Sequence, residues 1–428
     1  AGDQNVIKCG SYVGNGSATH RKIELGFEPQ WIMTKRADGG TGNWDIADMM
    51  RGTPADDGDS SQNGSFLWAN QNWAEATDRP FTTHSTGFGL KNTSSGTNGD
   101  GDTYIYMAIR RPDGYCGKQY GAGEGTSVFA MDTGNGSSTI PCFDSGFPVD
   151  FGLARKVAST WSWQTGARLI GGNMLNTNST NAEGQPSGWT WDSNAGWLSD
   201  SSFDSDFQSW MWKRHAGFDV VCYEGNGTSG TARNHSLNKT PEMIWIKRRD
   251  TSGNAGDWMV GHKGLNGGSS PWNEYLVLNK EQGEMSDNNP FNNVAPTTTA
   301  FQLSDWDRVN ANNSTYIAML FSSVNGISKV GSFSGSSSDV TLDLGFVPRF
   351  FMVKGRSGPQ DTRWVVWDSV RGITGGGADT PRIYLNDAGG SSPGANDNVA
   401  TTSSGITITT GPYYNNASGY EYIYYAHA

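Results

Sequence analysis

Four stretches of this 428-residue sequence follow one template, and that internal repeat limits the folds the chain can adopt more than any other feature. Each copy opens with a glycine-rich turn after a run of strand-forming residues. The four turns are Gly14-Asn15-Gly16, Gly134-Asn135-Gly136, Gly225-Asn226-Gly227 and the weaker Gly335-Ser336. Because Asn-Gly flanked by strand residues favours a tight turn, the pattern predicts a hairpin at the start of each copy.

Three further strands are predicted in every copy. A turn leads into an apolar strand within residues 25–36, 145–156, 239–248 and 344–354, and its terminal basic residue is expected at the solvent edge. An aromatic strand follows, containing Trp44, Trp163, Trp258 or Trp364. A strand rich in aromatic residues closes each copy, at residues 104–109, 209–213, 316–320 and 422–426.

The repeat predicts an all-β fold of four tandem antiparallel β-sandwich domains, of jelly-roll or lectin-like type. Each copy is about 100 residues of short strands and turns, which is the usual size of such a domain. The predicted domains span residues 1–112, 113–217, 218–324 and 325–428, called segments one to four below. Segment two departs most from the template, because Gly152 interrupts its apolar strand.

Composition excludes several classes of partner. The net charge of −11 argues against nucleic acid, whose binding needs a basic surface. The short basic clusters, such as Lys213-Arg214 and 247–249, are interpreted as solvated strand ends. No run of 18 apolar residues predicts a membrane span, and no signal peptide is visible. Four cysteines without a Cys-x-x-Cys pair are expected to be free, as in a reducing cytoplasm.

The repeated motifs resemble a domain of unknown function found in structural and tail-fibre proteins of marine tailed bacteriophages. The matching stretches are Tyr12–Ser17 with Gly26–Arg36, Gly345–Arg356 with Asp368–Gly372, and the closing strand Tyr316–Met319. The resemblance covers all four copies. It implies a non-enzymatic component of the virion, such as a fibre, an appendage or a capsid-surface protein.

Charged residues offer few catalytic or metal-binding patterns. Asp48 with Arg51, and Asp368 with Arg371, are spaced three apart and are read as ion pairs that lock a turn rather than as a sugar-binding pair. Oxygen ligands at Asp100 and Asp102, and in the loop 56–59, could hold Ca²⁺, although neither loop has EF-hand spacing, and a solvated turn is the favoured reading. No metal-binding histidine pattern and no nucleophile motif is present, so no catalytic residue is predicted.

The tryptophans divide into two sets. Those at template positions, including Trp31 and Trp245, are expected in the core. Seven others are specific to one copy and lie among polar loop residues, where they are candidates for contacting a sugar or another subunit. These seven are Trp68, Trp73, Trp189, Trp191, Trp197, Trp272 and Trp306. A subunit contact is favoured, because tryptophan concentrates at protein interfaces.

The sequence therefore predicts a virion structural protein, made in the host cytoplasm. Its expected partners are other virion proteins, copies of itself and, in one reading, host-surface polysaccharide. The alternative is a secreted glycan-binding adhesin. A polysaccharide-degrading enzyme has the least support, because paired carboxylates at a catalytic separation cannot be read from the sequence.

Overall fold

The computed structural model describes residues 6–17, 21–40, 42–51, 53, 64–79, 81–84, 86–90, 92–111, 123–191, 193–287, 289–373, 380–391, 399–411 and 413–428. The protein is all-β, with several antiparallel sheets, none of them closed. Each sheet takes its strands from one of the four segments. None of the helices in the described residues is long and apolar enough to cross a membrane.

Segment one has a six-stranded main sheet and a three-stranded second sheet. The main sheet runs in the order β1 (Ile7–Val13), β9 (Thr103–Arg110), β3 (Pro29–Arg36), β4 (Trp44–Asp48), β5 (Gly64–Trp68) and β6 (Ala76–Arg79). The second sheet runs β2 (Arg21–Glu24), β8 (Gly87–Leu90) and β7 (Phe81–His84).

Segment two has the shortest sheets. Its main sheet runs β10 (Phe129–Thr133), β15 (Phe207–Trp212), β12 (Phe151–Lys156) and β13 (Gln164–Ala167). Its second sheet pairs β11 (Phe143–Asp144) with β14 (Gly196–Trp197).

Segments three and four repeat the same plan. In segment three the main sheet runs β16 (Phe218–Glu224), β22 (Thr315–Phe321), β18 (Met243–Arg248), β19 (Trp258–His262) and β20 (Leu276–Val277), beside β17 (Thr231–Asn234) paired with β21 (Ala300–Leu303). In segment four it runs β23 (Ser328–Ser334), β30 (Glu421–His427), β25 (Phe350–Ser357), β26 (Val365–Asp368) and β27 (Ile383–Tyr384). Its second sheet runs β24 (Val340–Asp343), β29 (Gly405–Ile408) and β28 (Val399–Thr401).

The helices are all short. The one α-helix described is α1 (Asp307–Asn310). The 3-10 turns are η1 (Met49–Arg51), η2 (Gly125–Ser127), η3 (Arg168–Ile170), η4 (Gly253–Gly256), η5 (Leu265–Gly268) and η6 (Pro271–Asn273).

The first strand of every segment pairs with the last strand of that segment, so the predicted hairpin at the glycine-rich turn is wrong. In segment one, for example, Tyr12 of β1 lies opposite Tyr104 of β9. The glycines are needed for another reason. A Cβ atom on Gly14 would lie 2.0 Å from the carbonyl oxygen of Gly99, and Gly225 has the same relation to Ala311. Glycine therefore permits the close approach of the turn to the loop that precedes the last strand.

Each segment has a buried cluster between its main and second sheets. In segment three this cluster includes Ile244 and Ala318 of the main sheet and Phe301 and Leu303 of the second sheet. Equivalent clusters fill segments one, two and four. These positions alternate along the strands with residues on the opposite face of the main sheet, here called the outer face.

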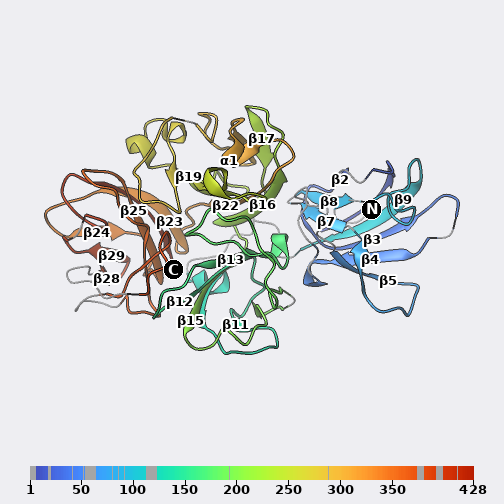
Figure 1. Cartoon of the computed structure of the whole chain (residues 1–428), viewed down its shortest axis with the longest axis horizontal. Coiled ribbons are helices and arrows are strands. Elements are labelled where there is room, and N and C mark those ends of the chain that lie inside the picture. Colours follow the sequence, from blue (N-terminus) through green and yellow to red (C-terminus); the bar gives the residue numbers. More distant parts are fainter. Residues whose placement is uncertain are drawn as a thin grey trace.

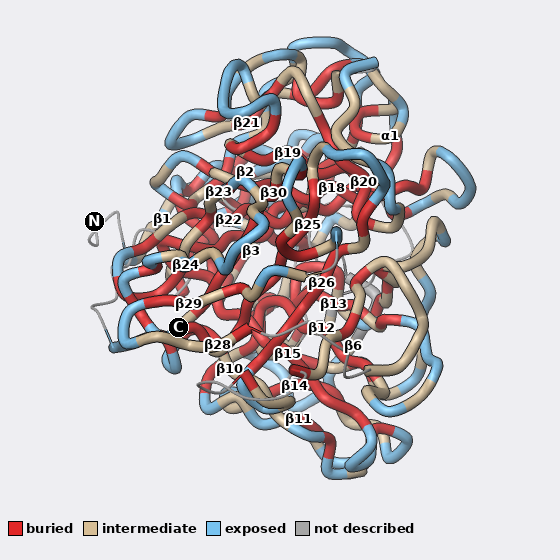
Figure 2. Tube along the Cα trace, turned by 90° about the vertical axis from the view of Figure 1, so that its left-hand side faces the viewer, coloured by how far each residue is buried: buried red, intermediate tan, exposed pale blue. Residues whose placement is uncertain are grey.

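The outer faces of segments two, three and four pack against one another. Their side chains form a shared cluster that includes Trp210, Met319 and Tyr425 at equivalent positions of β15, β22 and β30. Figure 1 shows these three segments gathered in one body, with segment one (blue) at its side. Figure 2 shows the buried chain running through β12, β22 and β25. Segments two, three and four thus form one unit, called the body below, and segment one is attached to it.

Segment one is fastened to the body through buried ion pairs. Arg111 donates to Asp150 of segment two at 2.8 Å, and Glu28 pairs with Arg214. Arg214 also donates to Asp219 at 2.6 Å. The prediction that such basic clusters are solvated strand ends is therefore wrong here, because all five side chains are almost completely buried.

Candidate assembly interface

A tryptophan at one template position joins the segments of the body. It stands at the start of the aromatic strand, and its indole N–H donates to a backbone carbonyl of another segment. The contacts are Trp163 to Tyr384 at 2.6 Å, Trp258 to Asn176 at 2.9 Å and Trp364 to Val277 at 3.1 Å. Segment two therefore contacts four, three contacts two, and four contacts three, which closes a ring of three.

The three acceptors begin equivalent loops of eight residues, here called contact loops, at 176–183, 277–284 and 384–391. Leu175, Leu276 and Ile383, which precede the acceptors, pair with equivalent residues of the aromatic strands. The last N–H of each loop donates to a backbone carbonyl at or just after the end of the neighbouring apolar strand. The bonds are Glu183 to Arg249 at 2.8 Å, Glu284 to Arg356 at 2.7 Å and Ser391 to Val157 at 2.6 Å. These three hydrogen bonds link the same pairs of segments as the tryptophan N–H groups do.

Buried cations reinforce these contacts. Arg155, Lys247 and Lys354 occupy one template position, and each is fully buried and donates to a contact-loop carbonyl of the next segment. Burial lowers the pKa of Arg155 to about 10, that of Lys247 to about 8 and that of Lys354 to about 7. The expectation that the basic residue lies at the solvent edge is wrong for these three, because the strand ends against a neighbouring segment.

Two contacts of the ring also carry an ion pair. Arg249 binds Glu183 through distances of 2.7 and 2.9 Å, and Arg356 binds Glu284 at 2.6 Å. The Arg249–Glu183 pair is bidentate, and such a pair fixes the relative geometry of its two partners as well as adding energy. The contact between segments two and four has Val157 and Ser391 at these positions and closes without the ion pair.

The predicted Asp-x-x-Arg ion pairs are present. Arg371 donates to Asp368 at 2.7 Å, and Arg51 pairs with Asp48. Asp368 also accepts the Trp210 indole N–H at 3.0 Å, so this turn is part of the contact between segments four and two.

Segment one carries the same local structure. Trp44 N–H donates to Asn70 Oδ1 at 2.9 Å, just as Trp258 N–H donates to Asn279 Oδ1. The stretch 68–75 is its contact loop, with Gln71 N–H donating to the Trp68 carbonyl at 3.2 Å. This loop is exposed from Ala69 to Glu75. Segment one therefore carries both the tryptophan and the contact loop that join the segments of the body.

The outer face of segment one differs sharply in burial. Ile105 is 42% exposed, whereas its counterparts Ile317 and Ile423 are 0% and 1% exposed. Trp31 and Trp44 are only half-buried. The prediction that template tryptophans lie in the core is therefore wrong for segment one, because no sheet of the described residues covers its outer face, whereas the outer faces of the other three segments cover one another.

The seven copy-specific tryptophans occupy different environments. In the core of segment two, Trp191 stacks on Trp197 and Trp189 meets Trp197 edge to face. Trp272 is buried in segment three. These four rings are packed inside the protein and have no open face for a sugar. Trp306 packs partly on the core of segment three, beneath Arg308. Trp68 and the 55% exposed Trp73 meet edge to face at 5.0 Å in the contact loop of segment one.

The two candidate calcium ligands, Asp100 and Asp102, lie in different surroundings. Asp102 pairs with Arg36, whereas Asp100 is exposed. The loop 56–59 lies outside the described residues. Within the described part of the chain, no three His, Cys, Asp or Glu side chains gather in a way that could hold a metal ion. Cys9, Cys142 and Cys222 are free.

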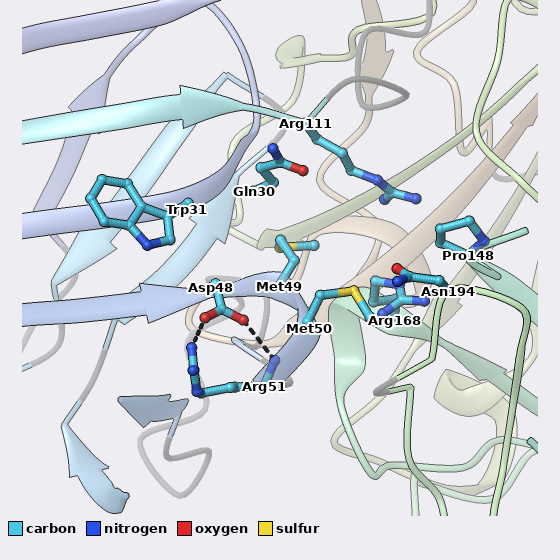
Figure 3. A pocket seen from close by; sticks show the side chains of 10 residues that line it. All are labelled: Gln30, Trp31, Asp48, Met49, Met50, Arg51, Arg111, Pro148, Arg168 and Asn194. Carbon is cyan, nitrogen blue, oxygen red and sulfur yellow. Dashed lines mark hydrogen bonds and ion pairs between the residues drawn. The ribbon is translucent and has the colours of Figure 1, made fainter. Parts of the chain in front are cut away.

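A cleft of about 630 Å³ lies where segment one meets segment two (Figure 3). Trp31, Met50 and the Asp48–Arg51 pair line it from segment one, and Arg168 and Asn194 line it from segment two. Figure 3 shows Trp31 and Arg51 on one side of the cleft, facing Arg168 and Asn194 across Met50. An aromatic ring beside polar and cationic groups suits a polar ligand such as a sugar.

Sequence reasoning missed the contact loops. Their signature is an asparagine followed four residues later by a small residue and a glutamate, as in Asn70 with Glu75, Asn178 with Glu183, and Asn279 with Glu284. Aligning the four copies beyond the aromatic strand would have found it. The contact loops join the segments mostly through their backbone N–H and carbonyl groups. Motifs of side chains therefore did not reveal them.

Comparison with known proteins identifies a family. No curated protein matches the chain. A family model described as a domain of unknown function (DUF7483) matches residues 4–112 and 164–428. The unmatched stretch falls in the first half of segment two, the copy that departs most from the template. Because the match covers most of the chain, the protein belongs to this family, the domain of unknown function DUF7483.

Proposed function

We propose that the protein is a structural component of a bacteriophage particle, as a tail fibre, an appendage or a capsid-surface protein. The observation that carries this proposal is the closed ring of segments two to four, in which the repeated tryptophans and buried cations are used to join segments. The motif resemblance to phage structural proteins supports it independently. A β-body whose three segments interlock in this way suits a component of a particle.

The proposed architecture is four tandem β-sandwich domains with the boundaries predicted from the sequence. In support, every sheet stays within one segment, and each segment has its own buried cluster between two sheets. The proposed role is non-enzymatic, because the two Asp-x-x-Arg pairs, which are the best charged constellation, are each joined as an ion pair at a turn. The proposed location is the virion, and the net charge of −11 argues against a role on nucleic acid.

Particle composition tests the proposal directly. Mass spectrometry of purified particles is expected to detect the chain at a fixed stoichiometry, and particle density maps are expected to show it outside the genome. Its absence from purified particles, together with its secretion from cells, would instead favour the adhesin.

A glycan contact is a second candidate role, favoured by the cleft beside Trp31. The tryptophan fluorescence of the chain is expected to change on titration with host-surface polysaccharide, and Asn194→Ala, on the opposite wall, should weaken that change. A polysaccharide that quenches Trp31→Phe protein as strongly as wild type would place binding elsewhere.

A further inference from the structure

The outer face of segment one is the one surface of its kind that the chain leaves uncovered in its described part. Its apolar side chains include Ile7, Met33, Ile46, Leu67, Ile105 and Met107, all half-buried or exposed. Equivalent positions in segments three and four, such as Val260, Leu276 and Val366, are fully buried in the shared cluster. A contiguous apolar face on a water-exposed sheet marks a protein interface.

The three-segment body shows which partner fits such a face. There, three copies of the template contact one another head to tail, and each donates a tryptophan N–H to one neighbour and accepts one from the other neighbour. Head-to-tail contacts form a closed ring when the rotation between neighbours closes, and here it closes after three. Because that ring is complete, it offers segment one no vacant position.

We propose that three copies of this chain associate through the outer faces and contact loops of segment one, in the ring arrangement that segments two to four form within each chain. The inference does not rest on the proposed phage role, because it follows from contacts within the chain.

Segment one has the donors and acceptors that this ring needs. Trp44 is placed to donate its indole N–H to the Trp68 carbonyl of the next copy, as Trp258 donates to Asn176. Glu75 N–H corresponds to Glu183 N–H, and the Ala37 carbonyl corresponds to the Arg249 carbonyl. Lys35 already donates to the Arg36 carbonyl at 3.1 Å, as Lys247 donates to Arg248. Each contact is therefore complementary between identical chains.

One feature of the ring is missing from segment one, and the body shows that it is dispensable. Ala37 stands where segments three and four have Arg249 and Arg356, so Glu75 would gain no cross-ring ion pair. The contact between segments two and four, with Val157 and Ser391, forms without one. Trp68 and Trp73, which the sequence singled out as possible subunit contacts, lie in the contact loop and would enter this interface.

The oligomeric state tests the proposal. Sedimentation velocity of the full chain, over a range of concentrations, is expected to give a species of three chain masses. Ile105→Glu places a charge in the middle of the face at an exposed position and is expected to give a folded monomer. Val370→Glu changes a 52% exposed valine of segment four in the same way and should leave the trimer intact.

Cys9 gives a second, site-specific measurement on the wild-type chain. It is exposed on the outer face, where its counterparts Val220 and Val330 are fully buried. Alkylation of Cys9, followed by peptide mass spectrometry, is expected to be at least tenfold slower in the wild type than in Ile105→Glu. A wild-type chain that stays monomeric or forms only dimers overturns the proposal. A trimer that Ile105→Glu leaves unchanged, with Cys9 equally reactive, overturns it as well.

Discussion

The same sheet face is a core surface in segments two, three and four and an open surface in segment one. Most residues at these positions are apolar, although segment two has Thr165 and Gln208 where segment one has Ile46 and Ile105. The tryptophan, the basic residue and the contact loop recur. The difference lies in what covers the face, because segments two, three and four close a ring, whereas no sheet in the described part of the chain covers the outer face of segment one. A repeated aromatic position therefore reports a contact to be made, and whether that contact is within the chain or between chains is a separate matter.

The basic residue at one template position also differs in its environment between segment four and segment one. Lys354 donates to Glu281 and Thr362 carbonyls in a buried site, and burial lowers its pKa to about 7. Lys35, at the same template position, is only half-buried. The chemistry of a repeated residue is thus set by the neighbour that desolvates it.

The largest expected effect is the loss of a ring tryptophan. Trp258→Ala should lower the free energy of unfolding by about 3–5 kcal/mol, because it leaves a cavity in the shared cluster and removes the bond to Asn176. Trp44→Ala should cost only about 1 kcal/mol, because this ring is half-exposed. Urea unfolding measures both, in the Ile105→Glu background so that association does not contribute. Equal costs would remove the distinction between the two faces.

Acid should destabilise the body more than segment one. Burial lowers the pKa of His262 in the body to about 3, below the ordinary value of 6.5. Its neutral form is therefore favoured in the folded state, so its stability contribution is complete above pH 6.5 and is lost as the pH falls towards 3. At pH 5 the loss should be about 2 kcal/mol.

His262→Gln should remove that part of the acid dependence, and urea unfolding at pH 7 and pH 5 compares the variant with wild type. An unchanged difference between the two pH values would show that His262 is not buried in its neutral form.

Alkali should have the opposite effect through Lys354. Because its folded pKa is lowered to about 7, the folded state binds fewer protons than the unfolded state between about pH 7 and pH 10.5. Stability should rise across this window by up to about 1.4 kcal/mol per pH unit. Lys354→Met should flatten the rise, whereas Lys35→Met, at the half-buried counterpart, should not. A flat wild-type profile that Lys354→Met leaves unchanged contradicts the assignment.

The smallest contrast concerns the contact-loop glutamates. Glu284 pairs with Arg356 at 2.6 Å across the ring, so Glu284→Gln should cost about 1 kcal/mol. Glu75 pairs with Arg51 at 3.1 Å within segment one, and its side chain is 41% exposed. Glu75→Gln should therefore cost less than about 0.5 kcal/mol. Thermal melts of the two variants, each beside wild type, measure the difference.

Much of the fold was predictable because it depends on local patterns. The apolar strands around Ile32, Ile246 and Met352 and the aromatic strands beginning near Trp44 and Trp258 were located from alternation and turn residues. The Asp368–Arg371 pair was predicted from its spacing alone. The pairing of β1 with β9 was not predicted, because strands about 90 residues apart meet through tertiary packing rather than through a turn.

The sequence by itself determined the number of repeats, the strand class and the position of every repeated tryptophan. It also determined that segment one carries apolar residues, such as Ile46 and Ile105, at template positions where segments three and four are apolar as well. Only the tertiary structure decided which copies bury that face and which backbone carbonyls receive the indole N–H groups. The physical reason is that burial and backbone hydrogen bonds between distant segments depend on how sheets pack, and no local pattern of side chains encodes that packing.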